Sequence, residues 1–231
     1  MRRLNLWQND LLREIIKPAL YLFAFALSGT LVLALIHSAT AKQIRENERL
    51  ALLRQINLLV APEHYNNDPL ADRVTLAADT MNSAEPVTVY RARQDQQPVA
   101  AIYVTTSPDG YSGKVRMVVG INADQSLAGV RVISHQETPG LGDRIDAAKD
   151  DWILEFTGKS LQNPSLDGWA VKKDGGQFDQ FTGATITARA VVNAVRATLL
   201  WSQAHQAHLY AMPVETSDET GEASATEAHH E

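Results

Sequence analysis

The 231-residue chain contains no cysteine and has only a small excess of acidic residues, with a formal net charge of −6. The absence of cysteine excludes disulfides, thiolate metal sites, iron–sulfur clusters and c-type haem attachment. The mild acidity argues against nucleic acid as a partner, because a nucleic-acid-binding domain usually carries a basic patch. Any redox function must therefore use a cofactor that is held by groups other than thiols.

Charge is also absent from one long run of the sequence, PALYLFAFALSGTLVLALI, at residues 18–36. About 20 apolar residues cross the hydrocarbon core of a bilayer, so we expect a transmembrane helix over residues 18–37. A buried soluble helix would usually show a polar stripe, and the apolar core of a signal peptide is normally about 7–15 residues long. The small residues of HSATA after the run resemble a cleavage site, so a cleaved signal peptide is the alternative.

Basic residues flank the predicted span in nearly equal numbers. They are Arg2, Arg3, Arg13 and Lys17 before it, and Lys42, Arg45, Arg49 and Arg54 after it. The positive-inside rule acts most strongly on short segments, whereas long domains translocate largely regardless of charge. We therefore expect residues 1–17 in the cytoplasm and the C-terminal domain outside it. In a bacterium, this predicts a single-pass protein of the inner membrane with a periplasmic domain.

The rest of the chain divides into three predicted segments. Residues 38–62 have the apolar spacing of a helix and are predicted to form a juxtamembrane helix that ends at Pro62. Residues 63–205 form the main domain. Residues 206–231 are predicted to be a disordered acidic tail, because they offer too little apolar surface to offset the entropy of ordering.

The main domain begins with strand-like runs and ends with helical ones. The runs at 87–90, 99–105, 114–121 and 127–134 are rich in Val and Ile. The sequences PDG at 108–110 and NAD at 122–124 are typical of hairpin turns. Helical spacing follows at 143–156 and, most clearly, at 187–201. Strands followed by segregated helices predict an α+β domain with an antiparallel sheet and packed helices.

Histidines near the C-terminus are the only hint of metal binding. They are His205, His208, His229 and His230. Their spacing is loose and no carboxylate ligand is fixed nearby, unlike the compact spacing of known metal sites. We therefore expect no metal site, and we interpret these histidines as part of a surface helix end and a solvated tail.

Three threonines surround a glycine at the start of the most strongly predicted helix. They are Thr182, Thr185 and Thr187, and the glycine is Gly183. Gly183 permits an unusual backbone dihedral, and Thr185 or Thr187 can cap the helix through its hydroxyl. The free N–H groups and the positive dipole end favour an anion there, above all a phosphate. A plain capping turn is the alternative, because short strings of this kind are common.

The string DQFTGATIT, from Asp179 to Thr187, resembles the flavinylation motif D-x-x-[ST]-G-A-[ST]-x-[ST]. PDGYSG at 108–113, HQETPGLGD at 135–143 and VKKDGGQFDQFTGAT at 171–185 accompany it. Together with the single N-terminal span, these blocks resemble the G-subunit family of the Rnf (also Rsx) ion-translocating electron-transport complexes over about residues 19–201. The C subunit of the sodium-pumping NADH:quinone reductase represents a related family that shares the flavin motif and the ETPGLG block, but PDGYSG favours the Rnf family.

The resemblance implies a covalent cofactor. In proteins with this motif, FMN is joined through its phosphate to a threonine hydroxyl, and the matching residue here is Thr185. The residues that would shape its loop are Thr182, Gly183 and Ala184. Thr187 matches the last motif position and is our candidate for the helix cap. Asp179 matches the aspartate that is recognised by the modifying enzyme, an FAD:protein FMN transferase.

The other blocks are expected to supply further flavin contacts. The expected contact residues are Tyr111, Ser112, Thr138, Leu141, Gly142 and Lys172. Leu141 can cover one ring face, or it can belong to the core of a tight strand-to-helix turn. Tyr111 and Ser112 can contact the ring or simply form the hairpin turn. Lys172 can place positive charge near the N1–C2=O edge of the flavin, or it can be a solvated strand end.

The resemblance also implies a function. We expect an electron-transfer subunit with covalent FMN, inside a membrane complex that links reduced ferredoxin, NAD and ion translocation, with the other Rnf/Rsx-type subunits as its partners. The subunit would not be active alone. One alternative is a component that resembles the C subunit of a sodium-pumping reductase. Others are a non-enzymatic membrane-anchored assembly or binding module, and a periplasmic enzyme that binds a free phosphate ester at the same helix start.

Overall fold

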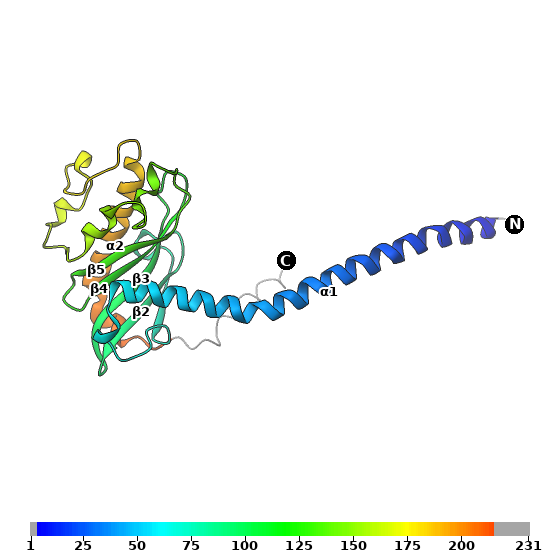
Figure 1. The fold of residues 1–231 in the computed structure, drawn as a ribbon, viewed down its shortest axis with the longest axis horizontal. Coiled ribbons are helices and arrows are strands. Elements are labelled where there is room, and N and C mark those ends of the chain that lie inside the picture. Colours follow the sequence, from blue (N-terminus) through cyan, green and yellow to red (C-terminus); the bar gives the residue numbers. More distant parts are fainter. Residues whose placement is uncertain (1–3, 215–231) are drawn as a thin grey trace. The chain divides into compact units, whose positions relative to one another are not determined.

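The computed structural model describes residues 4–214 of the chain (Figure 1). The chain divides into two compact units, with the boundary between Ala51 and Leu52. The predicted cytoplasmic segment 1–17 lies partly, and the last part of the predicted tail, residues 215–231, wholly, outside the described residues. The division into membrane and soluble segments stays a prediction.

A single α-helix, α1, extends from Leu4 to Leu59. Its part Ile16–Ala41 is 26 residues long and contains an 18-residue stretch with a mean hydropathy of 2.3, which is long and apolar enough to cross a membrane. The hydroxyls of Ser28 and Thr30 donate to main-chain carbonyls of the preceding turn at 2.8 and 2.9 Å, so these polar atoms are paired inside the helix. The sequence predicts two helical segments here, and the structure joins them, because residues 30–61 contain neither glycine nor proline.

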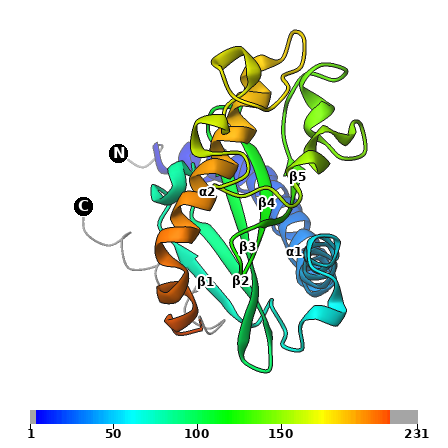
Figure 2. The same ribbon diagram turned by 90° about the vertical axis from the view of Figure 1, so that its left-hand side faces the viewer.

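The second unit is built on a five-stranded antiparallel sheet with the order β1-β2-β3-β4-β5 (Figure 2). The strands are β1 (Arg73–Leu76), β2 (Val87–Gln94), β3 (Gln97–Ser107), β4 (Val115–Asn122) and β5 (Leu127–Ser134). The four predicted runs and both predicted hairpin turns are confirmed. Sequence reasoning missed β1, because four residues with only two buried side chains give too short a pattern.

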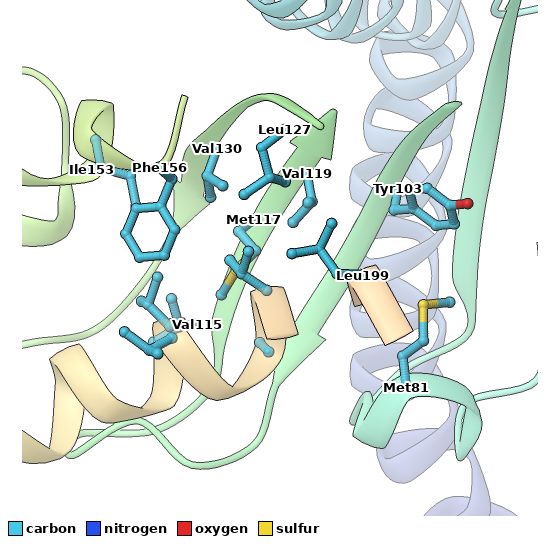
Figure 3. Close-up of a cluster of buried hydrophobic side chains, with 14 of the residues drawn as sticks. Met81, Tyr103, Val115, Met117, Val119, Leu127, Val130, Ile153, Phe156 and Leu199 are labelled. Atoms are coloured by element: carbon cyan, nitrogen blue, oxygen red, sulfur yellow. The ribbon is translucent and has the colours of Figure 1, made fainter. Parts of the chain in front are cut away.

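The sheet is buried on both faces, because side chains alternate along each strand. On one face, the sheet packs against helix α2 (Thr185–Ala211), and Figure 3 shows Leu199 of α2 among sheet residues such as Val119 and Leu127. On the other face, the last turns of α1 contribute Ile56 and Leu59 to a second cluster. The compact unit therefore begins near Leu52 rather than at the predicted boundary of residue 63.

Two glycines make room for the end of α1 on this second face. Gly120 of β4 and Gly129 of β5 are directly opposite each other in the ladder. A Cβ at Gly120 would lie 3.3 Å from the Leu59 side chain, and a Cβ at Gly129 would lie 2.9 Å from it. Any larger residue would push Leu59 away, so the pair fixes how closely the helix approaches the sheet.

The predicted helix over residues 143–156 is wrong. The structure has two short 3₁₀ turns instead, η3 (Gly142–Ile145) and η4 (Asp151–Phe156). The side chains of Asp146 and Asp150 accept the amides of residues 148 and 152, both at 2.9 Å. Aspartate side chains that bond the backbone in this way compete with helical hydrogen bonds, which explains why a helical apolar spacing does not become a helix.

Helix α2 is longer than predicted at both ends. It begins at Thr185 and continues to Ala211, so residues 206–211, predicted to start a disordered tail, are helical. The cause is a buried anchor, because Leu209 is fully buried and its carbonyl accepts a hydrogen bond from Arg91 at 2.7 Å. Local composition does not show such an anchor. His205 and His208 lie in this helix, whereas His229 and His230 are outside the described residues.

Candidate functional site

The start of α2 has no side-chain cap. Ala184 occupies the N-cap position, and the prediction that Thr187 or Thr185 caps the helix is wrong. Thr185 is the first helical residue and is half-buried. Thr187 is fully buried, and its hydroxyl donates to the Oε2 atom of Glu137 instead. The first amides of α2 thus have no side-chain oxygen from the N-cap, which leaves them available for an external acceptor.

Gly183 supplies the turn that leads into this helix. Its φ of 85° is in the left-handed region that favours glycine. A Cβ at this position would meet the Leu141 side chain at 3.5 Å. The role predicted for Gly183, a loop that needs an unusual dihedral, agrees with this geometry. Thr182, just before it, is exposed.

A small hollow of about 170 Å³ lies beside this turn. Its lining residues come from three separate segments and are Tyr111, Glu137, Thr138, Leu141, Gly142, Gly183, Ala184 and Thr187. Figure 2 shows the corresponding green and yellow loops gathered at the N-terminal end of α2. The fold therefore brings together the three sequence blocks that resemble the flavin-binding family. Ser112, Thr182, Thr185, Lys172 and Asp179 are not among the lining residues.

The loop at residues 137–142 is a tight turn organised by one carbonyl. The Thr138 carbonyl accepts the amides of Leu141 and Gly142 at 3.2 and 3.0 Å. Leu141 is 44 % exposed, so the interpretation that it belongs to the core is wrong, and its side chain lines the hollow. Gly142 is buried, and a Cβ there would lie 2.9 Å from the Glu137 side chain. Only glycine lets the loop pass this close.

The hairpin loop between β3 and β4 supplies the opposite wall. Tyr111 is 68 % exposed and lines the hollow. Ser112 is also exposed, and its amide, rather than its hydroxyl, donates a 3.0 Å hydrogen bond to Glu137 Oε1. Tyr111 and Leu141 together give the hollow an apolar, solvent-exposed rim.

Glu137 is the residue that sequence reasoning missed. It is the only acid among the lining residues and is 4 % exposed. Glutamate is rarely buried to this extent unless it is paired. Its position at the head of the ETPGLG block was the available signal, but periodicity cannot show that its partners, Ser112 and Thr187, lie 25 and 50 residues away.

Lys172 and Asp179 lie outside the hollow and contact each other. The Lys172 Nζ atom is 2.6 Å from Asp179 Oδ1, and both side chains are more than half exposed. The neighbouring Phe178 and Phe181 are buried, and the Trp152 indole donates to the Asp179 carbonyl at 2.9 Å. The backbone at Asp179 is thus fixed while its carboxylate faces solvent. Lys172 belongs to a 3₁₀ turn, Lys172–Asp174, rather than to a strand end.

A second ion pair holds this turn to α2. Arg189 donates to both carboxylate oxygens of Asp174 at 2.6 and 2.8 Å. The hydrogen bond from Arg189 lowers the pKa of the Asp174 carboxyl below its ordinary value. Both groups are at the surface, so this pair contributes little to stability. The pair instead connects the turn Lys172–Asp174, which precedes the TGAT string, to the first part of α2.

These residues fit a flavin mononucleotide whose phosphate lies at the start of α2. The amides and positive dipole end of the helix suit an anion, and the first turn of α2 contains no acidic side chain. Gly183 is exposed and Ala184 carries only a methyl group, so no large side chain covers the turn before the helix. Enclosed ligand pockets usually measure about 300–1,000 Å³, so a hollow of about 170 Å³ encloses only part of such a cofactor.

Comparison with known sequences agrees with this geometry. The profile of the FMN-binding domain matches residues 110–200, which span the hairpin loop, the 137–142 turn and the start of α2. The profile of the RnfG N-terminal region matches residues 8–59, which lie within α1. A relative from Vibrio cholerae O395, named as the G subunit of an ion-translocating oxidoreductase complex, is 44 % identical over 88 % of this chain and 97 % of the relative.

The chain belongs to this G-subunit family. A relative of the same name from Shewanella amazonensis is 43 % identical over 87 % of this chain and 94 % of the relative. One from Pseudomonas aeruginosa PAO1 is 46 % identical over 86 % of this chain and 94 % of the relative. The resemblance drawn from the sequence motifs is therefore confirmed, and so are an FMN-binding domain and an α+β fold preceded by a span-length helix.

Proposed function

We propose that this protein is the flavin-carrying electron-transfer subunit of an ion-translocating oxidoreductase complex, with FMN joined through its phosphate to Thr185. The observation that supports this most directly is the convergence of three distant sequence blocks around one hollow at an uncapped helix start. The names of the relatives support the complex, and the match to the RnfG N-terminal region favours the Rnf-type complex over the sodium-pumping reductase.

Burial distinguishes Thr185 from the other two threonines of the motif. Thr187 is fully buried and its hydroxyl is already engaged with Glu137, so a phosphate cannot reach it without breaking the packing. Thr182 is exposed but precedes Gly183 and lies outside the helix. Thr185 is half-buried at the first helical position, where the partial positive charge of the helix stabilises a singly charged phosphodiester.

The residues around the hollow would orient the cofactor. Tyr111 and Leu141 offer apolar surface for a flat ring, while Thr138, Gly142, Gly183 and Ala184 bring backbone groups close to it. Bound FMN would supply the electron-transfer chemistry, and the protein would supply the tether and the environment that sets its potential. Because the hollow is small, much of the cofactor would face outward, where other subunits of the complex can approach it.

The test is the mass of the denatured full chain after co-expression with an FAD:protein FMN transferase. Attachment of FMN with loss of water adds about 438 Da and makes the band fluorescent on a denaturing gel. Peptide mapping should place the added mass on Thr185. Attachment at Thr182 or Thr187 would contradict the residue assignment, and an unmodified chain beside an active transferase would contradict covalent attachment.

Asp179 is proposed to be recognised by the transferase. Its carboxylate is 58 % exposed and lies outside the hollow, which suits contact with a second enzyme better than contact with the bound flavin. The Asp179→Asn variant should fold but stay unmodified. The matched control is Asp167→Asn, which removes the same charge from an exposed side chain in the preceding turn Leu166–Gly168 and should be modified normally. Full loading of Asp179→Asn would remove this role.

The orientation in the membrane is proposed from the short, basic N-terminus, with the flavin domain on the periplasmic side of the inner membrane. An alkaline phosphatase fused after the C-terminus should be active, and a reporter that works only in the cytoplasm should be silent. The reverse pattern would place the domain in the cytoplasm and would contradict this part of the proposal.

A further inference from the structure

Glu137 is a buried carboxylate in the wall of the hollow that joins three segments of the chain. Its Oε1 atom accepts the Ser112 amide at 3.0 Å, and its Oε2 atom accepts the Thr187 hydroxyl. Its own amide donates to His135 Nδ1 at 3.1 Å. No ion pair of Glu137 with Lys, Arg or His is seen within residues 4–214.

The backbone closes tightly around this side chain. A Cβ at Gly110 would lie 2.8 Å from Glu137 Oε1, and a Cβ at Gly142 would lie 2.9 Å from Glu137 Cβ. Both neighbours must therefore be glycine for the carboxylate to keep its place. An apolar residue would usually stabilise such a site better than an acid without a cationic partner, so fold stability alone does not account for a glutamate here.

We propose that Glu137 sets the electrostatic environment of the flavin, by keeping the phosphate out of the hollow and by lowering the reduction potential of the ring. This inference rests on the proposed function. A fixed negative charge repels a phosphate, so the hollow takes an uncharged part of FMN and the phosphate stays at Thr185. Electrons that enter the ring add negative charge, which the nearby carboxylate, itself only 4 % exposed, opposes.

Thr187 reduces the effect of the Glu137 charge on the hollow, so its removal should have the opposite effect to the removal of Glu137. Its donated hydrogen bond withdraws part of the negative charge of Oε2 from the hollow. Removing this donor should make the hollow more negative, whereas removing the carboxylate should make it neutral. A residue pair that served only to hold the loops together would give effects of the same sign, since either change would loosen the same contact.

The test is the midpoint potential of the covalently loaded full chain, measured by spectroelectrochemistry at the same pH for every variant. Glu137→Gln should shift the potential upward and Thr187→Val should shift it downward. Thr187→Ser, which keeps the donor, should restore the wild-type value. Glu155→Gln, which removes an exposed charge from η4, should leave the potential unchanged. Equal potentials, or two shifts in the same direction, would overturn the proposal.

A second measurement needs no flavin. In the unloaded chain, hydrogen exchange at the Ser112 amide should become about tenfold faster in Glu137→Ala, because its acceptor is lost. Unchanged exchange would overturn the position of Glu137 described above. If Glu137→Gln remains without flavin, the direction of the shift is judged from Thr187→Val alone. A midpoint potential of Thr187→Val at or above the wild-type value would then overturn the proposal. A wild-type chain that gains no mass beside an active transferase would instead contradict covalent FMN.

Discussion

The two ends of helix α2 differ in how their backbone groups are bonded: the N-terminal end, called the open end below, has no side-chain cap, whereas carbonyls at the C-terminal end, the closed end, accept hydrogen bonds from a buried arginine. At the N-terminal end, Ala184 offers no capping side chain, and the neighbouring residues leave a hollow. At the C-terminal end, the Arg91 guanidinium donates to the Leu209 and Met212 carbonyls at 2.7 and 2.8 Å. The helix dipole favours an anion at one end and a cation at the other. The protein provides the cation itself, and the proposed flavin phosphate would be the anion.

The closed end of α2 is held by a network of ion pairs and hydrogen bonds rather than by a single contact. Arg91 is fully buried and bonds Asp72 Oδ1 through its Nε atom at 2.6 Å, while Arg93 bonds Asp72 Oδ2 at 2.7 Å. Arg93 also lies 5.0 Å from the centre of the Tyr210 ring. This network connects β2, the segment before β1 and the helix end. The C-terminal end of α2 is thus held by buried ion pairs and hydrogen bonds, whereas the N-terminal end is where we propose that the flavin is attached.

The largest expected effect tests the open end. Thr185→Ala should abolish covalent flavin, because only a hydroxyl can form the phosphoester, and it should change the melting temperature little, because Thr185 is not the cap. Intact mass and thermal melting of the full chain measure the two effects. Thr182→Ala is the control and should retain flavin. A Thr185→Ala chain that still gains about 438 Da would show that the open end has been assigned to the wrong residue.

The next effect tests the closed end. Arg91→Met should destabilise the protein by about 3 kcal/mol, because it removes one partner of a buried pair while Arg93 still neutralises Asp72. A loss of this size corresponds to a melting temperature about 6–12 °C lower for a domain of this length. Arg93→Met, at a side chain that is 15 % exposed, should lower it less. Flavin loading should survive both changes, and its loss in a folded Arg91→Met protein would mean that the two ends are not separable.

A smaller effect is expected on the pH dependence of stability, through two buried tyrosines near the C-terminal half of α2. Burial raises the pKa of Tyr103, which packs edge-on against Trp201, to about 12, and burial also raises the pKa of Tyr210. Because these folded-state values exceed the unfolded value of about 10, their contribution is complete below pH 10 and is lost as the pH rises towards 12. Tyr103→Phe should therefore reduce the fall in stability between pH 9 and pH 11 by about 1 kcal/mol. Chemical denaturation at pH 9, 10 and 11 measures it, and an unchanged fall would contradict the burial argument.

The smallest effect is expected from the end of the chain. Deleting residues 215–231 should leave the melting temperature and flavin loading unchanged, because this segment is acidic and nearly free of large apolar residues. The deletion keeps Met212, whose carbonyl accepts from Arg91. A melting temperature that falls by more than a few degrees would show that the closed end of α2 extends into this segment.

Elements that depend on local pattern could be predicted from the amino-acid sequence. A long uncharged run indicates the span, alternating Val and Ile indicate four of the five strands, and the blocks around Tyr111, Leu141 and Gly183 indicate the site. The strand and hairpin predictions are confirmed because strand periodicity and turn chemistry are properties of neighbouring residues, whereas the span and the individual site residues stay predictions. The same reasoning failed at residues 143–156, where aspartate side chains compete for the backbone amides.

The roles of the buried polar groups, in contrast, depend on contacts between distant residues that the folded chain creates. Thr187 looks like a helix cap in the sequence, but its hydroxyl bonds Glu137, 50 residues away. Arg91 looks like an ordinary strand arginine, but it bonds the Leu209 carbonyl, 118 residues away, and so extends α2 beyond its predicted end. A buried charge must find its partner wherever the fold brings one, and neither composition nor periodicity records which distant residue that is.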